Sequence, residues 1–222
     1  MLKNNSRESG EDGKALSFIR SQYRRWIIIL TITIFAGLIT GGILLHTPKP
    51  HSTRKLPLIG HAYNFSLVNS NGQPVSLSDS TGKVRLIAFI YTRCTTVCPI
   101  VTSQMVHLQS SLAQQRMLGK QVELISITID PSYDTESVLQ RYKKEFKVSP
   151  IGWEFLTGSK LSIDQTLKKY GIYAAKLSAS QYVHSVDEFL IDGKGNIRKE
   201  YGMDLLASGA ENDIVNLAHS EG

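Results

Sequence analysis

Cysteine is scarce in this chain: it occurs twice in 222 residues, as Cys94 and Cys98. Two cysteines form one disulfide at most, so the chain is not a disulfide-rich scaffold. They are also too few for a structural zinc site built from four thiolates. No cysteine stands directly after the long apolar run near the N-terminus, which argues against a lipoprotein signal. Any sulfur chemistry must therefore use this one pair.

The chain also lacks a cluster of Lys and Arg interleaved with aromatic residues, and it has no internal repeat or low-complexity segment. Its net charge is +6, but the first 25 residues hold six basic and three acidic side chains and so account for half of that excess. Nucleic-acid binding is therefore not predicted. A hydrophobic content of 41% is typical of an ordinary folded domain.

The longest apolar run, Trp26 to Leu45, has 20 residues and no charged side chain. As a helix it would span about 30 Å, the thickness of a bilayer core. Because Arg24 and Arg25 precede it, the positive-inside rule places the N-terminal segment in the cytoplasm and the rest outside the cytoplasmic (inner) membrane, in the periplasm. The alternative is a cleaved signal peptide, but the run is long for that and no clear Ala-x-Ala site follows it.

The sequence thus predicts a cytoplasmic segment at 1–25, a single transmembrane anchor at 26–45, a tether with three prolines at 46–59 and a folded domain at 60–222. Within that domain the hydrophobic patterns predict an N-terminal hairpin, followed by strand, helix, strand, helix, helix, hairpin and helix. The predicted ranges are 63–77, 84–91, 101–117, 121–130, 134–146, 159–171, 186–201 and 207–219. This order predicts an α/β, thioredoxin-like fold with an additional N-terminal hairpin.

Cys94 and Cys98 lie between the strand at 84–91 and the helix expected from Val101. If both fall in the first helical turns, their spacing puts the two Cβ atoms about 5–6 Å apart. Two thiolates at that distance can bind one soft metal ion or form a disulfide, and a helix N-terminus favours the thiolate form. A purely structural disulfide would stabilise little, because the loop it closes is so short. A metal or redox role is favoured.

Several stretches together resemble the Sco/SenC family of membrane-anchored copper proteins, in the family's order over roughly residues 60–205. The resemblance implies a copper-binding protein that delivers copper to the dinuclear copper centre of cytochrome c oxidase or keeps the thiols of that centre reduced. The matching stretches are Phe89–Cys94, Val97–Pro99, Ser126–Pro131 with Asp134 and Thr135, Trp153–Gly158, and His184–Ser185 ahead of Phe189–Asp192.

By their positions in the matching stretches, the resemblance implies that Cys94, Cys98 and His184 are the metal ligands. It also implies that Asp130 is an acidic residue next to these ligands. Thiolates select Cu(I), and imidazole suits Cu(I) and Cu(II). The implied partners are the copper-binding subunit of cytochrome c oxidase and another copper chaperone or a thiol reductase. One departure is that Tyr182 and Val183 precede His184, where relatives have an acidic residue. Met105 and Met117 are expected to pack in the core.

Three other functions remain open. A thiol–disulfide oxidoreductase would fit the fold, although such enzymes usually have two residues between their cysteines rather than three, and a reductase does not need His184. A peroxidase is disfavoured because Tyr91 stands where a proline is expected. A copper-dependent or redox sensor would use the same site. Apart from a possible thiol–disulfide reductase activity, the chain is not expected to be an enzyme.

Overall fold

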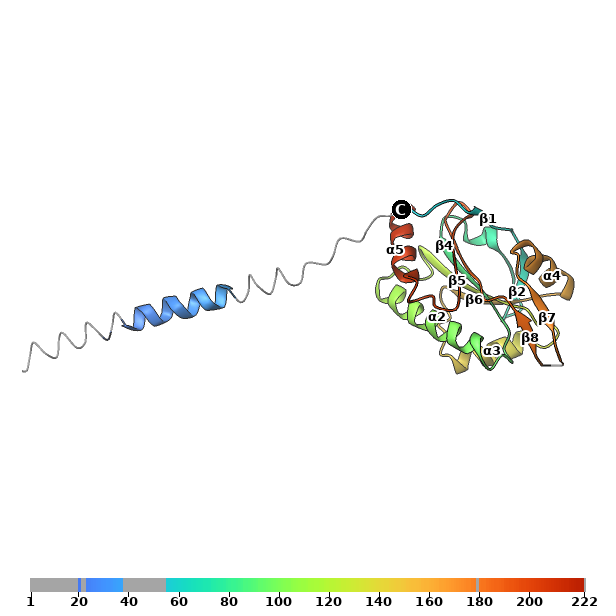
Figure 1. Cartoon of the computed structure of the whole chain (residues 1–222), viewed down its shortest axis with the longest axis horizontal. Coiled ribbons are helices and arrows are strands. Elements are labelled where there is room, and N and C mark those ends of the chain that lie inside the picture. The colour runs from blue at the N-terminus through green and yellow to red at the C-terminus, as the bar shows by residue number, and fades with distance from the viewer. Residues whose placement is uncertain (1–19, 21–22, 38–54, 179, 222) are drawn as a thin grey trace, which may run out of the picture. The chain divides into compact units, whose positions relative to one another are not determined.

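The structure is a computed structural model that describes residues 20, 23–37, 55–178 and 180–221 (Figure 1). It divides into two units, Met1–Pro50 and His51–Gly222. In the first unit, residues 23–37 are helical. No helix among the described residues is long and apolar enough to cross a membrane. Part of the predicted anchor, 38–45, lies outside the described residues, as does most of the predicted tether, 46–54.

The second unit is built on an eight-stranded sheet in the order β1-β10-β9-β4-β5-β6-β2-β3. The three central strands are parallel, and the outer strands pair antiparallel with their neighbours. The strands are β1 (Gly60–His61), β2 (Ser66–Asn69), β3 (Pro74–Ser76), β4 (Val84–Ile90), β5 (Val122–Thr128), β6 (Trp153–Thr157), β9 (Glu188–Ile191) and β10 (Asn196–Tyr201). Every residue of β4 is buried, as expected for a parallel strand covered on both faces.

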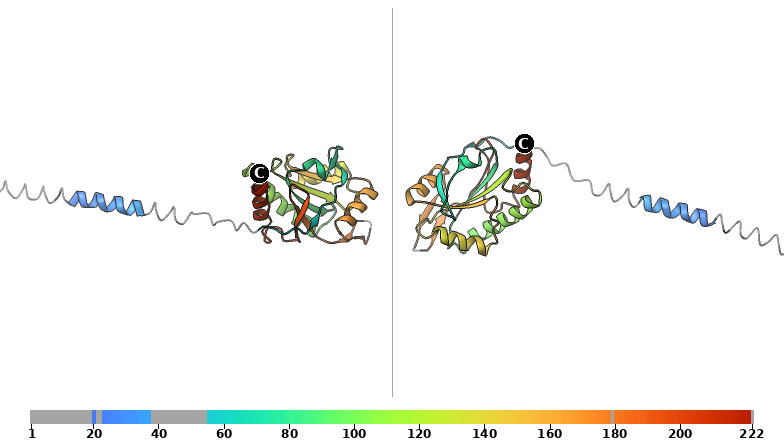
Figure 2. Two further views of the ribbon diagram at one scale, coloured as in Figure 1. Left: turned by 90° about the horizontal axis from the view of Figure 1, so that it is seen from above. Right: turned by 180° about the vertical axis from the view of Figure 1, so that it is seen from behind.

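Helices cover both faces of the sheet. They are α2 (Val97–Gln114), α3 (Glu136–Glu145), α4 (Lys160–Lys169) and α5 (Ala210–Glu221), with a short 3-10 helix, η1, at Leu77–Ser80. Thr102 of α2 and Tyr142 of α3 share a hydrogen bond of 2.9 Å, and Ser111 of α2 donates to Glu211 of α5. These three helices therefore lie together, and α2 and α5 are neighbours in Figures 1 and 2.

The opposite face carries α4. Phe89 of β4 packs against Tyr170, the residue that follows α4, with ring centroids 5.6 Å apart. Ala88, the neighbour of Phe89 in β4, pairs with Ser126 of β5, which in turn pairs with Phe155 of β6. The ring of Phe155 contacts Tyr142 of α3. Because successive side chains of a strand point to opposite faces, α3 and α4 cover different faces. The predicted α/β, thioredoxin-like class is confirmed.

Two local features differ from the sequence prediction. The helix expected from Val101 begins at Val97, because a proline such as Pro99 is tolerated in a first helical turn, where its missing N–H has no partner to lose. A separate two-stranded sheet, β7 (Ala174–Lys176) and β8 (Tyr182–His184), was not predicted. Its strands are short and partly exposed, so they leave no clear hydrophobic alternation. The expected core packing of Met105 and Met117 is confirmed, since both are buried.

One buried acidic residue stands out in the sheet. Glu188 is 1% exposed, and its Oε2 atom has no hydrogen-bond partner. It pairs with Ala88 of β4 and with Tyr201 of β10, so it lies on the face that α2, α3 and α5 cover. Desolvation, together with the nearby charge of Asp187, raises the pKa of Glu188 to about 8. At neutral pH this carboxyl group is held in its protonated form.

We predict that Glu188 makes stability fall as the pH rises from about 4.5 to about 8. In that range the folded chain holds a proton that the unfolded chain has released, so raising the pH favours unfolding. Glu188→Gln should remove this dependence, which is worth about 2–4 kcal/mol across the range. Urea unfolding at pH 5 and pH 8.5, followed by Trp153 fluorescence, measures it. The exposed Glu200→Gln is the matched control, and an equal slope in parent and Glu188→Gln would contradict the assignment.

Candidate metal centre

Three potential ligands from distant parts of the sequence meet at one end of the sheet. Cys94 lies in the turn after β4, where its N–H donates to the Tyr91 carbonyl at 3.2 Å. Cys98 is the second residue of α2, and His184 is the last residue of β8. Their ligand atoms all lie within 4.8 Å of one another. Within the described part of the chain, no other group of three such side chains comes together in this way.

The two thiols are held by the start of α2 and by each other. The Cys98 N–H donates to Cys94 Sγ at 3.4 Å, and Thr96 Oγ1 lies 3.7 Å from the same sulfur. The sequence left open whether Cys94 lies in the helix. In the structure, Cys94 lies in the turn before α2. Both cysteines are free thiols and buried, with 6% and 2% of their surfaces exposed.

The imidazole of His184 is oriented by its own backbone neighbourhood. Its Nδ1 lies 2.6 Å from the Ser185 carbonyl oxygen, which can only accept, so Nδ1 carries the hydrogen. In the neutral ring this leaves the lone pair on Nε2, which lies 3.8 Å from Cys98 Sγ. The ring also packs edge-on against Tyr91, with centroids 5.6 Å apart. His184 is thus arranged as a third donor beside the two sulfurs.

The two thiols have opposite electrostatic tendencies. The hydrogen bond from the Cys98 thiol, with further help from backbone N–H groups, lowers the pKa of Cys94. The same interaction with Cys94, together with burial, raises the pKa of Cys98. The metal-free pair therefore holds one thiolate, on Cys94, and one protonated thiol, on Cys98. A metal ion that binds both sulfurs must displace the second proton.

Asp130 lies beside this group but is not one of its three members. It is 1% exposed, and its oxygens accept from Arg93 and from the hydroxyl of Tyr182. Arg93 directly precedes Cys94, and Tyr182 precedes His184 by two residues. The structure thus connects Asp130 to the chain segments that carry the candidate ligands.

A second buried carboxylate holds the cysteine turn. Asp134 accepts from the N–H and hydroxyl of Thr92 and from the hydroxyl of Thr128 at the end of β5. Burial raises the pKa of Asp134, and these hydrogen bonds oppose the shift. Sequence reasoning missed the roles of Thr92, Thr128 and Tyr182, and the partners of Thr92 and Tyr182 lie 42 and 52 residues away in the chain. The position of Thr128 at the end of β5 was the only available signal.

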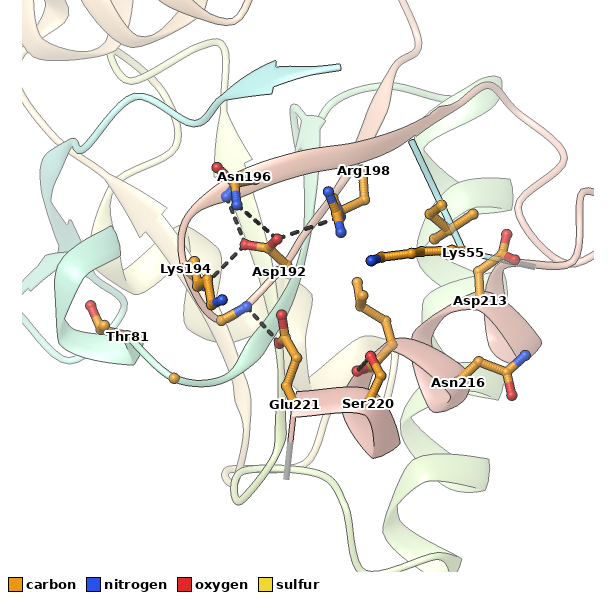
Figure 3. A pocket seen from close by; sticks show the side chains of 14 residues that line it. Lys55, Thr81, Asp192, Lys194, Asn196, Arg198, Asp213, Asn216, Ser220 and Glu221 are labelled. Carbon is orange, nitrogen blue, oxygen red and sulfur yellow. Dashed lines mark hydrogen bonds and ion pairs between the residues drawn. The ribbon is translucent and has the colours of Figure 1, made fainter. Parts of the chain in front are cut away.

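The other histidines among the described residues, and one large cavity, lie away from the cysteines. His107 is largely exposed, 3.9 Å from Glu211 of α5, and His61 and His219 are exposed. A cavity of about 1000 Å³ is lined by residues that include Lys55, Asp192 and Glu221 (Figure 3). The turn that begins at Asp192 joins β9 to β10 at the starting end of β4, whereas Cys94 follows the other end. This cavity is therefore separate from the sulfur site.

Comparison with known proteins relates this fold and site to one family. The family model described as SCO1/SenC matches residues 56–219. The chain is 32% identical over 150 residues to a protein of Bacillus subtilis (strain 168) named SCO1 protein homolog. The aligned region covers 66% of this chain and 76% of that protein. The same family was expected from the sequence motifs.

Two solved structures are similar over the folded unit. One, described as Arabidopsis thaliana ScoI with copper bound, is 27% identical with a TM-score of 0.60, covering 69% of this chain and 98% of that chain. The other is BsSco, described as having a disulfide switch and as a member of the Sco family of cytochrome c oxidase assembly proteins. It is 28% identical with a TM-score of 0.62, covering 75% of this chain and 96% of that chain.

We predict that alkylation of Cys94 depends little on pH, because the lowered pKa of Cys94 keeps its sulfur ionised. Between pH 8 and pH 6, its rate with iodoacetamide should change less than about twofold, whereas an ordinary thiol slows by more than about tenfold. Peptide mass spectrometry distinguishes Cys94 from Cys98, and the urea-unfolded chain serves as the control. A Cys94 rate that falls as steeply as in the unfolded chain would disprove the assignment.

Proposed function

The chain belongs to the SCO1/SenC family, and from this premise we propose that it is a copper-binding assembly factor for cytochrome c oxidase. The observation that carries the proposal is the meeting of Cys94, Cys98 and His184, whose ligand atoms lie within 4.8 Å of one another. Copper here is the cargo: the chain would take it from a donor protein and pass it to the dinuclear copper centre of the oxidase.

The donor set suits copper in both oxidation states. Two thiolates favour Cu(I), and an imidazole with its lone pair on Nε2 adds a donor that also suits Cu(II). Three ligands leave a coordination position open, so an incoming thiolate or imidazole of the recipient can bind before the ion leaves. The buried setting protects the thiolates, while α2 supplies an N–H to Cys94 Sγ at 3.4 Å.

We expect one copper ion per chain. Replacing either cysteine by serine should weaken binding by more than about a hundredfold, since a hydroxyl is a poor ligand for a soft ion. His184→Ala should keep part of the Cu(I) affinity through the two thiolates but weaken Cu(II) binding strongly. Competition titrations measure the affinities, and the thiolate-to-copper charge-transfer band reports sulfur ligation. His107→Ala, which changes an exposed histidine outside the site, is the control.

In cells, each of the three ligand variants should lower cytochrome c oxidase activity, with partial recovery when copper is added. Unchanged oxidase activity in the His184→Ala cells, together with loss in the cysteine variants, would argue for thiol reduction instead of copper delivery. Tight binding of one copper equivalent by the double Cys→Ser variant would disprove the site assignment itself.

The second candidate function, reduction of the recipient's disulfide to two thiols, is favoured by the unequal pKa values of Cys94 and Cys98. The Cys94 thiolate would attack the recipient's disulfide, form a mixed disulfide and release one recipient thiolate. Cys98 would then lose its proton and attack Cys94 Sγ, which forms the Cys94–Cys98 disulfide and releases the second thiolate. Two electrons pass to the recipient, whose two thiolates take up the proton that Cys98 released and one more from the solvent. A copper delivery step and this reduction step can serve the same target.

The membrane arrangement is a further part of the proposal. Residues 26–45 would anchor the chain in the cytoplasmic membrane, residues 1–25 would lie in the cytoplasm, and the tether 46–59 would hold the copper-binding domain, 60–222, in the periplasm. The apolar run and the preceding Arg24 and Arg25 support it. In this compartment the thiols meet oxidants, so copper or a reductase must protect them.

We predict that a reporter enzyme fused after Gly222 is active only outside the cytoplasm, and that residues 47–222 alone form a soluble monomer. The first expectation follows from the charge in front of the apolar run, the second from the position of the buried core, which begins after residue 60. Reporter assays in whole cells and gel filtration of the shortened chain test them. Reporter activity confined to the cytoplasm would overturn the topology, and recovery only as aggregate would overturn the domain boundaries.

A further inference from the structure

His184 is carried by a hairpin that is not part of the main sheet. β7 and β8 pair only with each other, through three aligned residue pairs. An isolated two-stranded hairpin is at best marginally stable in water. Its outer side is exposed, with 49% of Val183 and 66% of Leu177 accessible. The distance between the imidazole and the two sulfurs must therefore be set by contacts between this hairpin and the rest of the domain.

Tyr182 makes three such contacts from one residue. Its hydroxyl donates to Asp130 Oδ1 at 3.1 Å, and its N–H donates to the Tyr91 hydroxyl at 3.4 Å. Its ring packs against that of Tyr91, with centroids 5.4 Å apart. Tyr91 in turn packs against the ring of His184. The side chain two residues before the candidate ligand thus holds the hairpin against the end of the sheet.

Asp130 provides a rigid attachment point for Tyr182. It is almost fully buried, and its other oxygen, Oδ2, accepts from Arg93 Nη2 at 2.5 Å in a charge-assisted hydrogen bond. The guanidinium of Arg93 also stacks on Tyr133, 3.9 Å from the ring centroid. Since Arg93 directly precedes Cys94, one carboxylate is bound to the segment that carries the sulfurs and to the segment that carries the imidazole.

We propose that Tyr182 is a positioning residue for the metal site: its hydroxyl, bound to Asp130, keeps the β7–β8 hairpin closed and so keeps His184 beside the two thiols. The inference rests on the proposed copper function. When the Tyr182–Asp130 bond breaks, the hairpin loses one of its attachments and the imidazole moves away, while the two sulfurs stay in place. The bond therefore controls Cu(II) binding, which needs the imidazole, more than Cu(I) binding, which the thiolates sustain.

Tyr182→Phe tests this with a minimal change, because it removes the hydroxyl but keeps the ring and the backbone N–H. The full-length chain in detergent is used. Without metal, hydrogen exchange of the amides in 174–184 should accelerate about five- to tenfold, as expected for the loss of one hydrogen bond. With metal, Cu(II) affinity should fall about five- to tenfold, whereas Cu(I) affinity should change less than about twofold.

Two controls isolate the role of the hydroxyl. Tyr173→Phe removes a hydroxyl from a tyrosine that is 61% exposed and directly precedes β7, and it should leave all three measurements unchanged. In the His184→Ala background, Tyr182→Phe should cause no further loss of Cu(II) affinity, because the imidazole that it positions is absent. The thiolate-to-copper charge-transfer band should weaken little in Tyr182→Phe, since both sulfurs remain bound.

The outcomes separate this inference from the proposed function. If the parent chain binds no copper, the proposed function fails, while the hydrogen-exchange comparison still tests whether Tyr182 closes the hairpin. If the parent binds copper and Tyr182→Phe matches it in exchange and in Cu(II) affinity, the positioning role is wrong. Equal losses for Cu(I) and Cu(II), or a further Cu(II) loss in the His184→Ala background, would also overturn it, since the hydroxyl would then act on the sulfurs or on the fold.

Discussion

The parallel pairing of β4 with β5 is the constraint on which the whole site depends. The two strands run in register from Val84 opposite Val122 to Ile90 opposite Thr128, and the Ile129 N–H extends the ladder by donating to the Ile90 carbonyl. Because both strands end at one edge, the segments that follow them emerge side by side. β9 runs antiparallel to β4 and starts at the same edge, so the segment before it, which contains His184, arrives there too. Three separate chain segments thus meet without any contact that depends on a metal ion.

Two buried carboxylates hold these three chain segments in a defined geometry, and each carboxylate binds a different pair of segments. Asp134 accepts three hydrogen bonds from Thr92 and Thr128, so it ties the cysteine turn to the end of the neighbouring strand. Asp130 connects Arg93 with Tyr182 and so reaches out to the hairpin. A buried carboxylate is costly unless it is fully hydrogen-bonded. Both residues meet that condition, whereas Glu188, with an unpartnered oxygen, instead stays protonated.

The sequence predicted the parts of this site that have a local signal. The apolar run at 84–91 predicted β4, and the position of Cys94 and Cys98 after it placed both sulfurs at a strand-to-helix turn. The start of α2 was predicted four residues late, at Val101, whereas the helix begins at Val97 and accommodates Pro99 in its first turn. His184 could not be distinguished from other histidines by its own surroundings, and only the resemblance to a family singled it out. The bond between Tyr182 and Asp130 joins residues 52 positions apart, and no local pattern encodes such a contact.

The three candidate ligands are consequently held with unequal rigidity, and this suits the proposed copper delivery, in which the ion has to be released. Cys98 lies in a long helix packed on the core, and Cys94 lies in a turn bound by Asp134, so both sulfurs are anchored to the body of the domain. His184 lies on a short hairpin with exposed outer residues and few attachments to the domain. A donor that moves can leave first, which lowers the coordination number and opens the ion to a recipient's ligand while both thiolates still hold it. In the proposed delivery, release would begin with a small movement of β8, and the sheet that supports the sulfurs would not need to change.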